Sequence, residues 1–230
     1  TMNALGLLLD EREKFEEAET LLRKVLTLWQ KQKGEGHPDT LAALSNLALV
    51  LEKTGRLEEA EGLRRTELKI SEEKLGPLHP QTLGCVNNLA LLVEKQGKYE
   101  EAEQLYRRAL AGRQQSLGKS HPDTLSSVGN LALFLEERGR LEESERLYCT
   151  VIAVADDEPE ESVHPYAWYF MANYADFLKN VGRVDEAVSV CTRALGAQQR
   201  TLGPDHPNTK YSLKVMGWIQ AAAGINSAHT

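Results

Sequence analysis

The sequence of 230 residues predicts an all-α fold, an α-solenoid of antiparallel helical hairpins. The first observation is a fixed period, because the dipeptide His-Pro begins at residues 37, 79, 121, 164 and 206. The second is that the pattern after His-Pro also recurs, with Asn-Leu-Ala beginning at residues 46, 88 and 130. A period of about 42 residues is typical of repeat arrays, in which each unit packs only on its neighbours. Function is therefore expected to reside on an extended surface rather than in a pocket.

Each repeat is expected to begin with a helix, called helix A. In the second repeat its apolar and small residues follow the three-and-four spacing of a helix with one buried face: Leu41, Leu44, Leu47, Ala48 and Leu51. Pro38 suits the first turn, because the N–H that proline lacks has no partner at that position. Gly55 is expected to end the helix, since a residue without Cβ readily takes the left-handed conformation that closes many helices.

A second helix, helix B, is predicted to follow the glycine. Its apolar stripe is Leu57, Ala60, Leu63 and Leu68, and Leu75-Gly76-Pro77 ends it. The short glycine-containing turn makes the two helices an antiparallel hairpin. Small residues recur where the helices of a hairpin must cross closely: Ala48, Ala90 and Ala132 in helix A, and Ala60, Ala102 and Ser144 in helix B.

The repeats predict a single array that begins and ends within a repeat. Its units are residues 1–34 (partial), 35–76, 77–118, 119–161, 162–203 and 204–230 (partial, helix A only). Arrays normally end in polar capping elements, but Trp218-Ile219-Gln220-Ala221-Ala222-Ala223 is not polar. We therefore expect the chain to be a piece of a longer protein.

Composition and charge argue against several classes of partner. A formal net charge of −7 argues against binding to nucleic acid, which needs clustered Lys and Arg. The apolar stretch 4–9 is too short to span a bilayer or to form a signal-peptide core, so no membrane partner is expected. Cys85, Cys149 and Cys191 are odd in number and lie in helical patterns, which predicts reduced, buried thiols in a soluble, cytoplasmic protein.

Two stretches depart from the repeat. In helix B of the second repeat, Arg64 and Glu67 replace the residues that are Tyr106 and Ala109 one repeat later. They could pair as charges three residues apart, but we favour a solvated irregularity, because surface ion pairs are common and weak. The segment 156–161, Asp-Asp-Glu-Pro-Glu-Glu, lacks the alternating ligands and the glycine of a calcium loop, so we interpret it as a solvated loop without a metal.

The residues of one repeat resemble those of a known family. Asn-Leu-Ala, Gly-Arg-Leu-Glu-Glu-Ala-Glu from residue 55, Leu-Tyr-Arg-Arg-Ala-Leu at 105–110, and then Leu-Gly and His-Pro, are similar in order to the tetratricopeptide repeat (TPR). The 42-residue period with its Leu-Gly and His-Pro connection resembles the kinesin light chain type. This resemblance, over nearly the whole chain, implies a right-handed superhelix whose A helices line a concave groove for peptide segments of other proteins. For the kinesin light chain type it implies acidic peptides around a tryptophan.

The A-helix residues that lie off the hairpin stripe fall into rows across successive repeats. One row consists of asparagines: Asn46, Asn88, Asn130 and Asn173. An amide side chain offers two donors and an acceptor, enough to hold the backbone of an extended peptide, and similar asparagines contact bound peptide in the family that the repeat resembles. The alternative is that these amides hydrogen-bond between repeats and hold the stack together.

A second row, three residues further along each helix, changes character along the chain. It consists of Leu49, Leu91, Leu133, Asp176 and Trp218. Exposed leucines would form a patch for a partner, although packing under the next repeat is the interpretation that we favour. Charged side chains follow the row, among them Lys53, Lys95 and Lys179 beside several glutamates, so the edge of the groove is of mixed sign.

The C-terminal part is rich in aromatic residues: Tyr166, Trp168, Tyr169, Tyr174, Tyr211 and Trp218. Aromatic side chains with polar tips are enriched at protein interfaces, which makes Tyr169, Tyr211 and Trp218 candidates for contact with a partner. The alternative, which we favour, is that these residues fill wider gaps in a degenerate repeat.

The histidines and motifs do not predict an enzyme. Five of the six histidines begin His-Pro at the same place in each repeat, so they are expected to lie one repeat apart and not to converge as metal ligands or bases do. No glycine-rich phosphate loop, Gly-x-Ser-x-Gly or His-Glu-x-x-His occurs in the sequence. No catalytic residue, cofactor, metal or small-molecule substrate is therefore expected.

Two non-catalytic functions fit these expectations. In the first, the array is an adaptor or scaffold that binds a linear peptide or protein segment in the groove of its A helices. In the second, it is a structural or regulatory array that packs against a switch domain of its own protein or self-associates through its terminal repeats.

Overall fold

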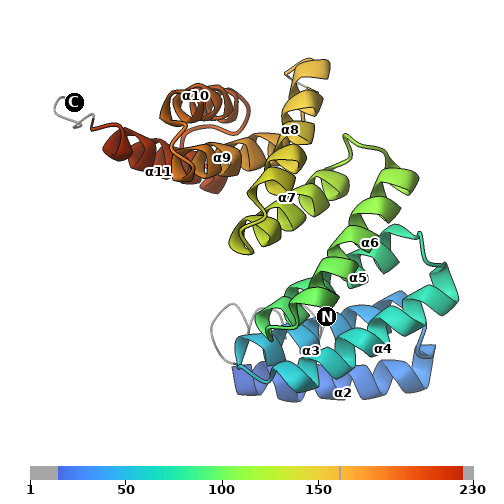
Figure 1. Cartoon of the computed structure of the whole chain (residues 1–230). Coiled ribbons are helices and arrows are strands. Elements are labelled where there is room, and N and C mark those ends of the chain that lie inside the picture. The colour runs from blue at the N-terminus through green and yellow to red at the C-terminus, as the bar shows by residue number, and fades with distance from the viewer. Residues whose placement is uncertain (1–14, 161, 225–230) are drawn as a thin grey trace. The chain divides into compact units, whose positions relative to one another are not determined.

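The part of the chain that the structure describes, residues 15–160 and 162–224, contains ten α-helices and no β-strand in the computed structural model (Figure 1). This confirms the predicted all-α fold class. The helices are α2 (Phe15–Lys33), α3 (Pro38–Lys53), α4 (Leu57–Leu75), α5 (Pro80–Lys95), α6 (Tyr99–Leu117), α7 (Pro122–Glu137), α8 (Leu141–Asp157), α9 (Pro165–Asn180), α10 (Val184–Thr201) and α11 (Pro207–Ala222). Helices α3, α5, α7, α9 and α11 are the A helices, and each begins at the proline of a His-Pro pair. None of these ten helices is both long and apolar enough to cross a membrane.

The chain divides into two compact units, residues 1–116 and 117–230. In the first unit, α3 packs on both α2 and α4, and α4 also packs on α5. In the second unit, α9 contacts α8, α10 and α11, and it also lies beside α7 (Figure 1). Three A helices, α7, α9 and α11, are therefore neighbours within one unit.

Each unit has a core made from the apolar stripes of neighbouring helices. In the first unit the core is mostly aliphatic and includes Leu22, Leu41, Leu44, Leu51 and Leu92. In the second unit Tyr148 of α8 packs against Tyr174 and Phe177 of α9, with ring centroids 5.3 and 5.8 Å apart. Tyr174 stands where the earlier repeats have leucine, and its larger ring is packed in the core, which agrees with the gap-filling role considered for the C-terminal aromatic residues.

The repeated histidine starts each A helix as a cap. Its Nδ1 accepts a hydrogen bond from the backbone N–H two residues later, at 3.1 or 3.2 Å in all five cases, and proline takes the first helical position. A capping side chain satisfies one of the N–H groups that the first turn leaves without a partner. The five imidazoles therefore serve five separate helix starts, and in residues 15–160 and 162–224 no group of three or more His, Cys, Asp or Glu side chains could hold a metal ion.

Glycine ends the A helices for a conformational reason. Gly55 and Gly97 have φ values of 79° and 77°, in the left-handed region that residues with a Cβ rarely adopt. The N–H of the residue after each glycine then bonds back into the helix, from Arg56 to the Leu51 carbonyl and from Lys98 to the Val93 carbonyl, both at 2.9 Å. A Cβ added at Gly97 would meet no heavy atom within 4 Å, so space is not the constraint.

Small residues allow the helices to approach closely. The six positions predicted at the hairpin crossings are all fully buried: Ala48, Ala60, Ala90, Ala102, Ala132 and Ser144. The Ser144 hydroxyl donates to the Ala132 carbonyl at 2.8 Å, which satisfies the only polar side chain of this set. Between α7 and α9, the ring of Phe170 occupies the space beside Gly129, where a Cβ would lie 1.8 Å from a ring carbon.

The expectation of a solvated irregularity at Arg64 and Glu67 is wrong. Both side chains are buried, with exposed fractions of 5% and 4%. Arg64 Nη1 donates to Glu67 Oε2 at 3.3 Å and to Ser45 Oγ at 2.7 Å, while its Nε and Nη2 donate to Glu52 Oε1 at 3.1 and 3.0 Å. Two of the partners, Ser45 and Glu52, come from helix α3, so burial of this guanidinium depends on the packing of the hairpin.

The next two repeats make the same connection with tyrosine. The Tyr106 hydroxyl donates to Glu94 at 2.5 Å, and the Tyr148 hydroxyl donates to Glu136 at 3.4 Å. In all three hairpins, a donor on helix B reaches the glutamate that lies twelve residues earlier on helix A. Arg64 thus replaces the tyrosine that makes this contact between helices B and A in the next two repeats.

Two further expectations need correction. The segment 156–161 is not a loop throughout, because Asp156 and Asp157 belong to α8; its exposed Asp156 and partly exposed Glu160 pair with Arg193 and Arg200 of α10 at 2.5 and 2.7 Å, and residue 161 lies outside the described residues. Among the three free thiols, Cys85 and Cys191 are buried as expected, but Cys149 is exposed. It lies on α8 next to Thr150, which is also exposed.

Candidate functional site

The candidate site consists of side chains at four equivalent positions in each A helix. Positions five, nine, twelve and sixteen residues after each capping histidine have the spacing that places side chains on one side of a helix. We call these side chains the A-helix face. In the first unit they are Ala42, Asn46, Leu49 and Lys53 in α3, and Gly84, Asn88, Leu91 and Lys95 in α5. In the second unit they are Ser126, Asn130, Leu133 and Glu137 in α7, Tyr169, Asn173, Asp176 and Asn180 in α9, and Tyr211, Val215, Trp218 and Ala222 in α11.

In the first unit this face carries small, amide and aliphatic side chains and ends in lysines. Asn46, Asn88 and Leu49 are half-buried, whereas Leu91, Lys53 and Lys95 are exposed. A Cβ added at Gly84 would meet nothing within 4 Å, so the surface is open at that position. Lys95 Nζ reaches back to Glu52 Oε2 at 3.6 Å and so joins α5 to α3.

In the second unit the face is aromatic and charged. Tyr169 and Tyr211, both half-buried, lie with their ring centroids 5.2 Å apart. Trp218 is 48% exposed, and Lys179 Nζ lies 5.5 Å from the centroid of its ring. The same ammonium group pairs with Asp176 Oδ1 at 2.5 Å. Helices α9 and α11 therefore bring an indole, a carboxylate and an ammonium group together.

The four asparagines of the predicted row do not share one environment. Asn130 is half-buried, as are the two asparagines of the first unit, and Leu133 one turn further along α7 is exposed. Asn173 is only 5% exposed, and its Nδ2 and Oδ1 have no hydrogen-bond partner in the described part of the chain. A buried amide without partners is costly, so a ligand that donates to this group and accepts from it would remove that cost.

Glu136 of α7 is a part of the site that the sequence analysis treated only as one of several edge glutamates. Its carboxylate accepts from the Tyr148 hydroxyl at 3.4 Å and from Asn180 Nδ2 at 3.5 Å. Burial raises the pKa of Glu136, and the nearby charge of Asp176 adds to the rise. The recurring spacing of twelve residues between this glutamate and Tyr148 was the signal available in the sequence.

Two tyrosines near this carboxylate keep their protons at neutral pH. Burial raises the pKa of Tyr211 to about 12, and the neighbouring Tyr169 and Asp176 contribute to the rise. Burial also raises the pKa of Tyr148, with the charge of Glu136 as the next cause. Both hydroxyls therefore remain hydrogen-bond donors.

The aromatic residues of the C-terminal part divide between core and surface. Trp168 and Tyr174 are buried and belong to the packed interior. Tyr166 is exposed beside the capping His164, with ring centroids 4.9 Å apart. The other three aromatic residues singled out in the sequence are those that lie on the A-helix face.

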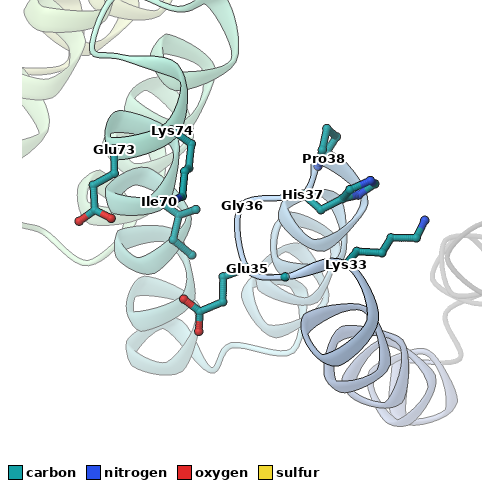
Figure 2. A pocket seen from close by; sticks show the side chains of 9 residues that line it. Lys33, Glu35, Gly36, His37, Pro38, Ile70, Glu73 and Lys74 are labelled. Atoms are coloured by element: carbon teal, nitrogen blue, oxygen red, sulfur yellow. The ribbon is translucent and has the colours of Figure 1, made fainter.

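A recess of about 640 Å³ in the first unit is not a convincing ligand site (Figure 2). Figure 2 shows Ile70 and Lys74 of α4 across from the connection between α2 and α3, which carries Glu35 and His37. The charged residues around the recess, Lys33, Glu35, Glu73 and Lys74, are exposed and of both signs. Ligand and catalytic sites instead gather a few buried polar groups that converge on one point.

The chain matches one protein-family model. That model is described as Tetratricopeptide repeat, and it matches residues 1–73, 39–114, 82–157 and 167–225. These four segments together include every residue of the A-helix face. No curated protein matches the sequence.

Solved structures with a similar fold include other helical repeat proteins. The nearly identical TPR-like repeats of a Podosopora anserina protein assigned as a kinesin light chain share 25% identity at a TM-score of 0.71, over 87% of this chain and 94% of that chain. BtubC (BKLC) from P. vanneervenii has 20% identity and a TM-score of 0.65, over 100% and 81%. The apo quorum sensor NprR from B. thuringiensis has 14% identity and a TM-score of 0.68, over 98% and 60%. At their lower identities, the last two show similarity of fold alone.

Proposed function

Because this chain belongs to the tetratricopeptide repeat family, we propose that it is a non-catalytic interaction module that binds an extended segment of a partner protein on its A-helix face. The similarity to TPR-like repeats of the kinesin light chain type supports an adaptor or scaffold role. In that role the bound segment would link its own protein to whatever else the adaptor carries.

The observation that carries this proposal is the row of amides on the A-helix face, with Asn173 buried and unsatisfied. An extended peptide presents unpaired backbone N–H and C=O groups along its length. A carboxamide can donate to a carbonyl and accept from an N–H, so one asparagine per repeat can hold successive peptide units. This mode resembles strand addition, with side-chain amides in place of a sheet edge.

The neighbouring side chains suit the side chains of such a peptide. In the first unit Gly84 leaves open space beside Asn88, which lets a backbone approach closely. In each unit an exposed leucine, Leu91 of α5 and Leu133 of α7, offers apolar contact one turn from the asparagine of its own helix. Because alternate side chains of an extended peptide point the same way, every second residue of the ligand would face this surface.

A peptide-array experiment tests the proposal. The full chain is screened against an array of random-sequence peptides, and the hits are measured again with the Asn88→Ala/Asn130→Ala variant. We expect most hits to lose affinity by about ten-fold or more, because each substitution removes the partner of a peptide backbone group.

The matched control removes two exposed amides from helix B, in Gln104→Ala/Gln199→Ala, and should bind as the unmodified chain does. Circular dichroism of both variants establishes that the helices are intact. If every hit survives the asparagine substitutions, or if no peptide binds the intact chain, the proposed function is wrong.

A further inference from the structure

The most distinctive feature of the second unit is the position of Lys179. Its ammonium group lies 2.5 Å from Asp176 Oδ1 and 5.5 Å from the centre of the Trp218 ring. In the first three complete repeats the positions of Asp176 and Trp218 are leucines. A carboxylate and an indole around one ammonium group are the two side-chain types that proteins use to hold an organic cation.

This arrangement leaves room for a cation from outside. Trp218 remains 48% exposed although Lys179 lies over its ring. Lys179 and Asp176 are three residues apart on α9, so their pairing needs no contact with another helix, and their side chains are 18% and 28% exposed. The position of Lys179 shows that a positive charge is favourable between Asp176 and Trp218.

The corresponding glutamates differ in what neutralises them: Glu94 of the first unit accepts from the neutral Tyr106 hydroxyl, whereas Glu52 lies beside cations. In the first unit, Glu52 lies against two cations of the chain, Arg64 at 3.0 Å and Lys95 at 3.6 Å. In the second unit, Glu136 accepts from two neutral donors, the Tyr148 hydroxyl at 3.4 Å and the Asn180 amide at 3.5 Å. Both of these hydrogen bonds are long, so a stronger donor could displace or supplement them.

Two further observations in the second unit favour a positively charged ligand here. Burial and the charge of Asp176 hold the pKa of Glu136 above its usual range, which a positive charge nearby would reverse. Asn173, with both amide atoms unsatisfied, lies one turn from Asp176 on the same face of α9. An arginine side chain offers five donors in a flat group that stacks on aromatic rings, so it can serve the carboxylates and the indole together.

We propose that the A-helix face of the second unit binds a basic side chain of the partner segment, preferably arginine, between Glu136, Asp176 and Trp218, where it takes over the contacts of Lys179. This inference rests on the proposed function, since it names the chemistry of the peptide that the face binds. It differs from the acidic ligand that the resemblance to the kinesin light chain type implies. The reason is that Glu137 and Asn180 of the second unit stand at the face position that Lys53 and Lys95 occupy in the first unit, and that Glu136 and Asp176 add carboxylates beside it.

Arginine-to-citrulline exchange tests the charge requirement directly. Array peptides that bind the full chain are resynthesised with citrulline, which keeps the shape of arginine and removes its charge. We expect binding to weaken by about ten-fold or more, because a charge-assisted hydrogen bond becomes a neutral one. Glu136→Gln and Asp176→Asn should each weaken the arginine peptide and leave the citrulline peptide unchanged.

The matched controls remove the same charges from exposed positions away from the face, in Glu142→Gln of α8 and Asp185→Asn of α10. They should leave the affinity for the arginine peptide unchanged. A substitution with the opposite expected sign is Lys179→Met, which keeps the side-chain length. Because it removes the competing ammonium group, it should strengthen binding of the arginine peptide several-fold, an effect that damage to the fold cannot produce.

The outcomes separate this inference from the proposed function. If the hits lose affinity in the Asn88→Ala/Asn130→Ala variant but bind equally well with citrulline, or carry no basic residue, the inference is overturned and the proposed function stands. If Lys179→Met weakens the arginine peptide, the inference is also overturned. If no peptide binds the intact chain, the proposed function fails first.

Discussion

The imidazole of each repeated histidine acts as a hydrogen-bond acceptor at the start of a helix. This role requires an unprotonated Nδ1, because the backbone N–H donates to the lone pair of that atom. For His164, burial lowers the pKa of the imidazole, and the neighbouring His121 contributes to the lowering. Protonation of His164 Nδ1 would break its hydrogen bond with the Tyr166 N–H and place a charge on a partly buried imidazole.

Acidification should therefore weaken the cap at His164. Because its pKa is lower in the folded state than the unfolded value of about 6.5, the unfolded chain binds more protons in mildly acidic solution. The stability that this group contributes is complete above the unfolded value and is lost as the pH falls through it toward the folded pKa. Asparagine caps helices without titrating, so His164→Asn should reduce the loss of stability between about pH 7 and pH 5.

Urea unfolding at a series of pH values measures this effect. His164→Ala, which removes the cap altogether, should cost about 1 kcal/mol at neutral pH. An unchanged slope of stability against pH in His164→Asn would show that this imidazole does not contribute to the pH dependence.

At the scale of the helix and hairpin, one side chain on helix B donates a hydrogen bond to a glutamate on helix A. Tyrosine takes that role twice, and in the α3–α4 hairpin Arg64 takes it with Glu67 as an added partner. Burial raises the pKa of Glu67 although Arg64 lies beside it, because removal from water opposes its charge. A buried ion pair of this kind specifies a geometry more than it stabilises one.

Substitutions at this pair should have opposite effects. Arg64→Ala leaves two buried carboxylates without their guanidinium and should destabilise the chain by about 3 kcal/mol. Arg64→Tyr with Glu67→Ala recreates the residues of the following repeat, and we expect it to be neutral or stabilising by about 1 kcal/mol. Urea unfolding distinguishes the two, and a double variant as unstable as Arg64→Ala would contradict this account.

At the scale of the whole molecule, stability is distributed among neighbouring repeats. The chain forms two compact units, and within them A helices pack on neighbouring helices, as α3 does on α2 and α4, and α9 on α7, α8, α10 and α11. In such an array a local defect is expected to affect its own hairpin and the adjacent ones and to fade beyond them. The contact of Phe170 with Gly129, which joins α7 to α9, provides a place to introduce that defect.

Gly129→Ala should destabilise only the second unit. The added Cβ would lie 1.8 Å from the Phe170 ring, and such overpacking typically costs about 1–3 kcal/mol. Hydrogen exchange should become faster in α7 and α9 and stay unchanged in α3 and α4. The matched control is Gly62→Ala on the exposed side of α4, where a Cβ meets nothing and helix propensity should add about 1 kcal/mol of stability. Equal acceleration in both units would contradict local stability.

The helices were predictable because their signals are local. Proline starts a helix, glycine ends it, and apolar residues three and four apart mark the buried side, all within a few residues of one another. The family match confirms the tetratricopeptide assignment that these signals supported. The histidine caps were harder to foresee, since serine, threonine, aspartate and asparagine are the usual capping residues.

The candidate site was predictable only in part. Helix periodicity was enough to align the asparagines and the row that runs from Leu49 to Trp218. It did not distinguish Asn173, which is buried and unsatisfied, from Asn88, which is half-buried. Periodicity describes one helix at a time, whereas burial depends on the size of side chains on the helices beside it.

By itself, the sequence determined that this protein is an array of helical hairpins with one repeated surface, because period, turns and helix ends depend on neighbouring residues. Only the tertiary structure decided that Arg64 is buried, that Cys149 is exposed and that Lys179 lies between Asp176 and Trp218. Two of these outcomes depend on residues that are far apart in the sequence and meet when helices pack, Arg64 with Glu52 and Lys179 with Trp218. Desolvation and charge then act on groups whose nearness no local pattern specifies.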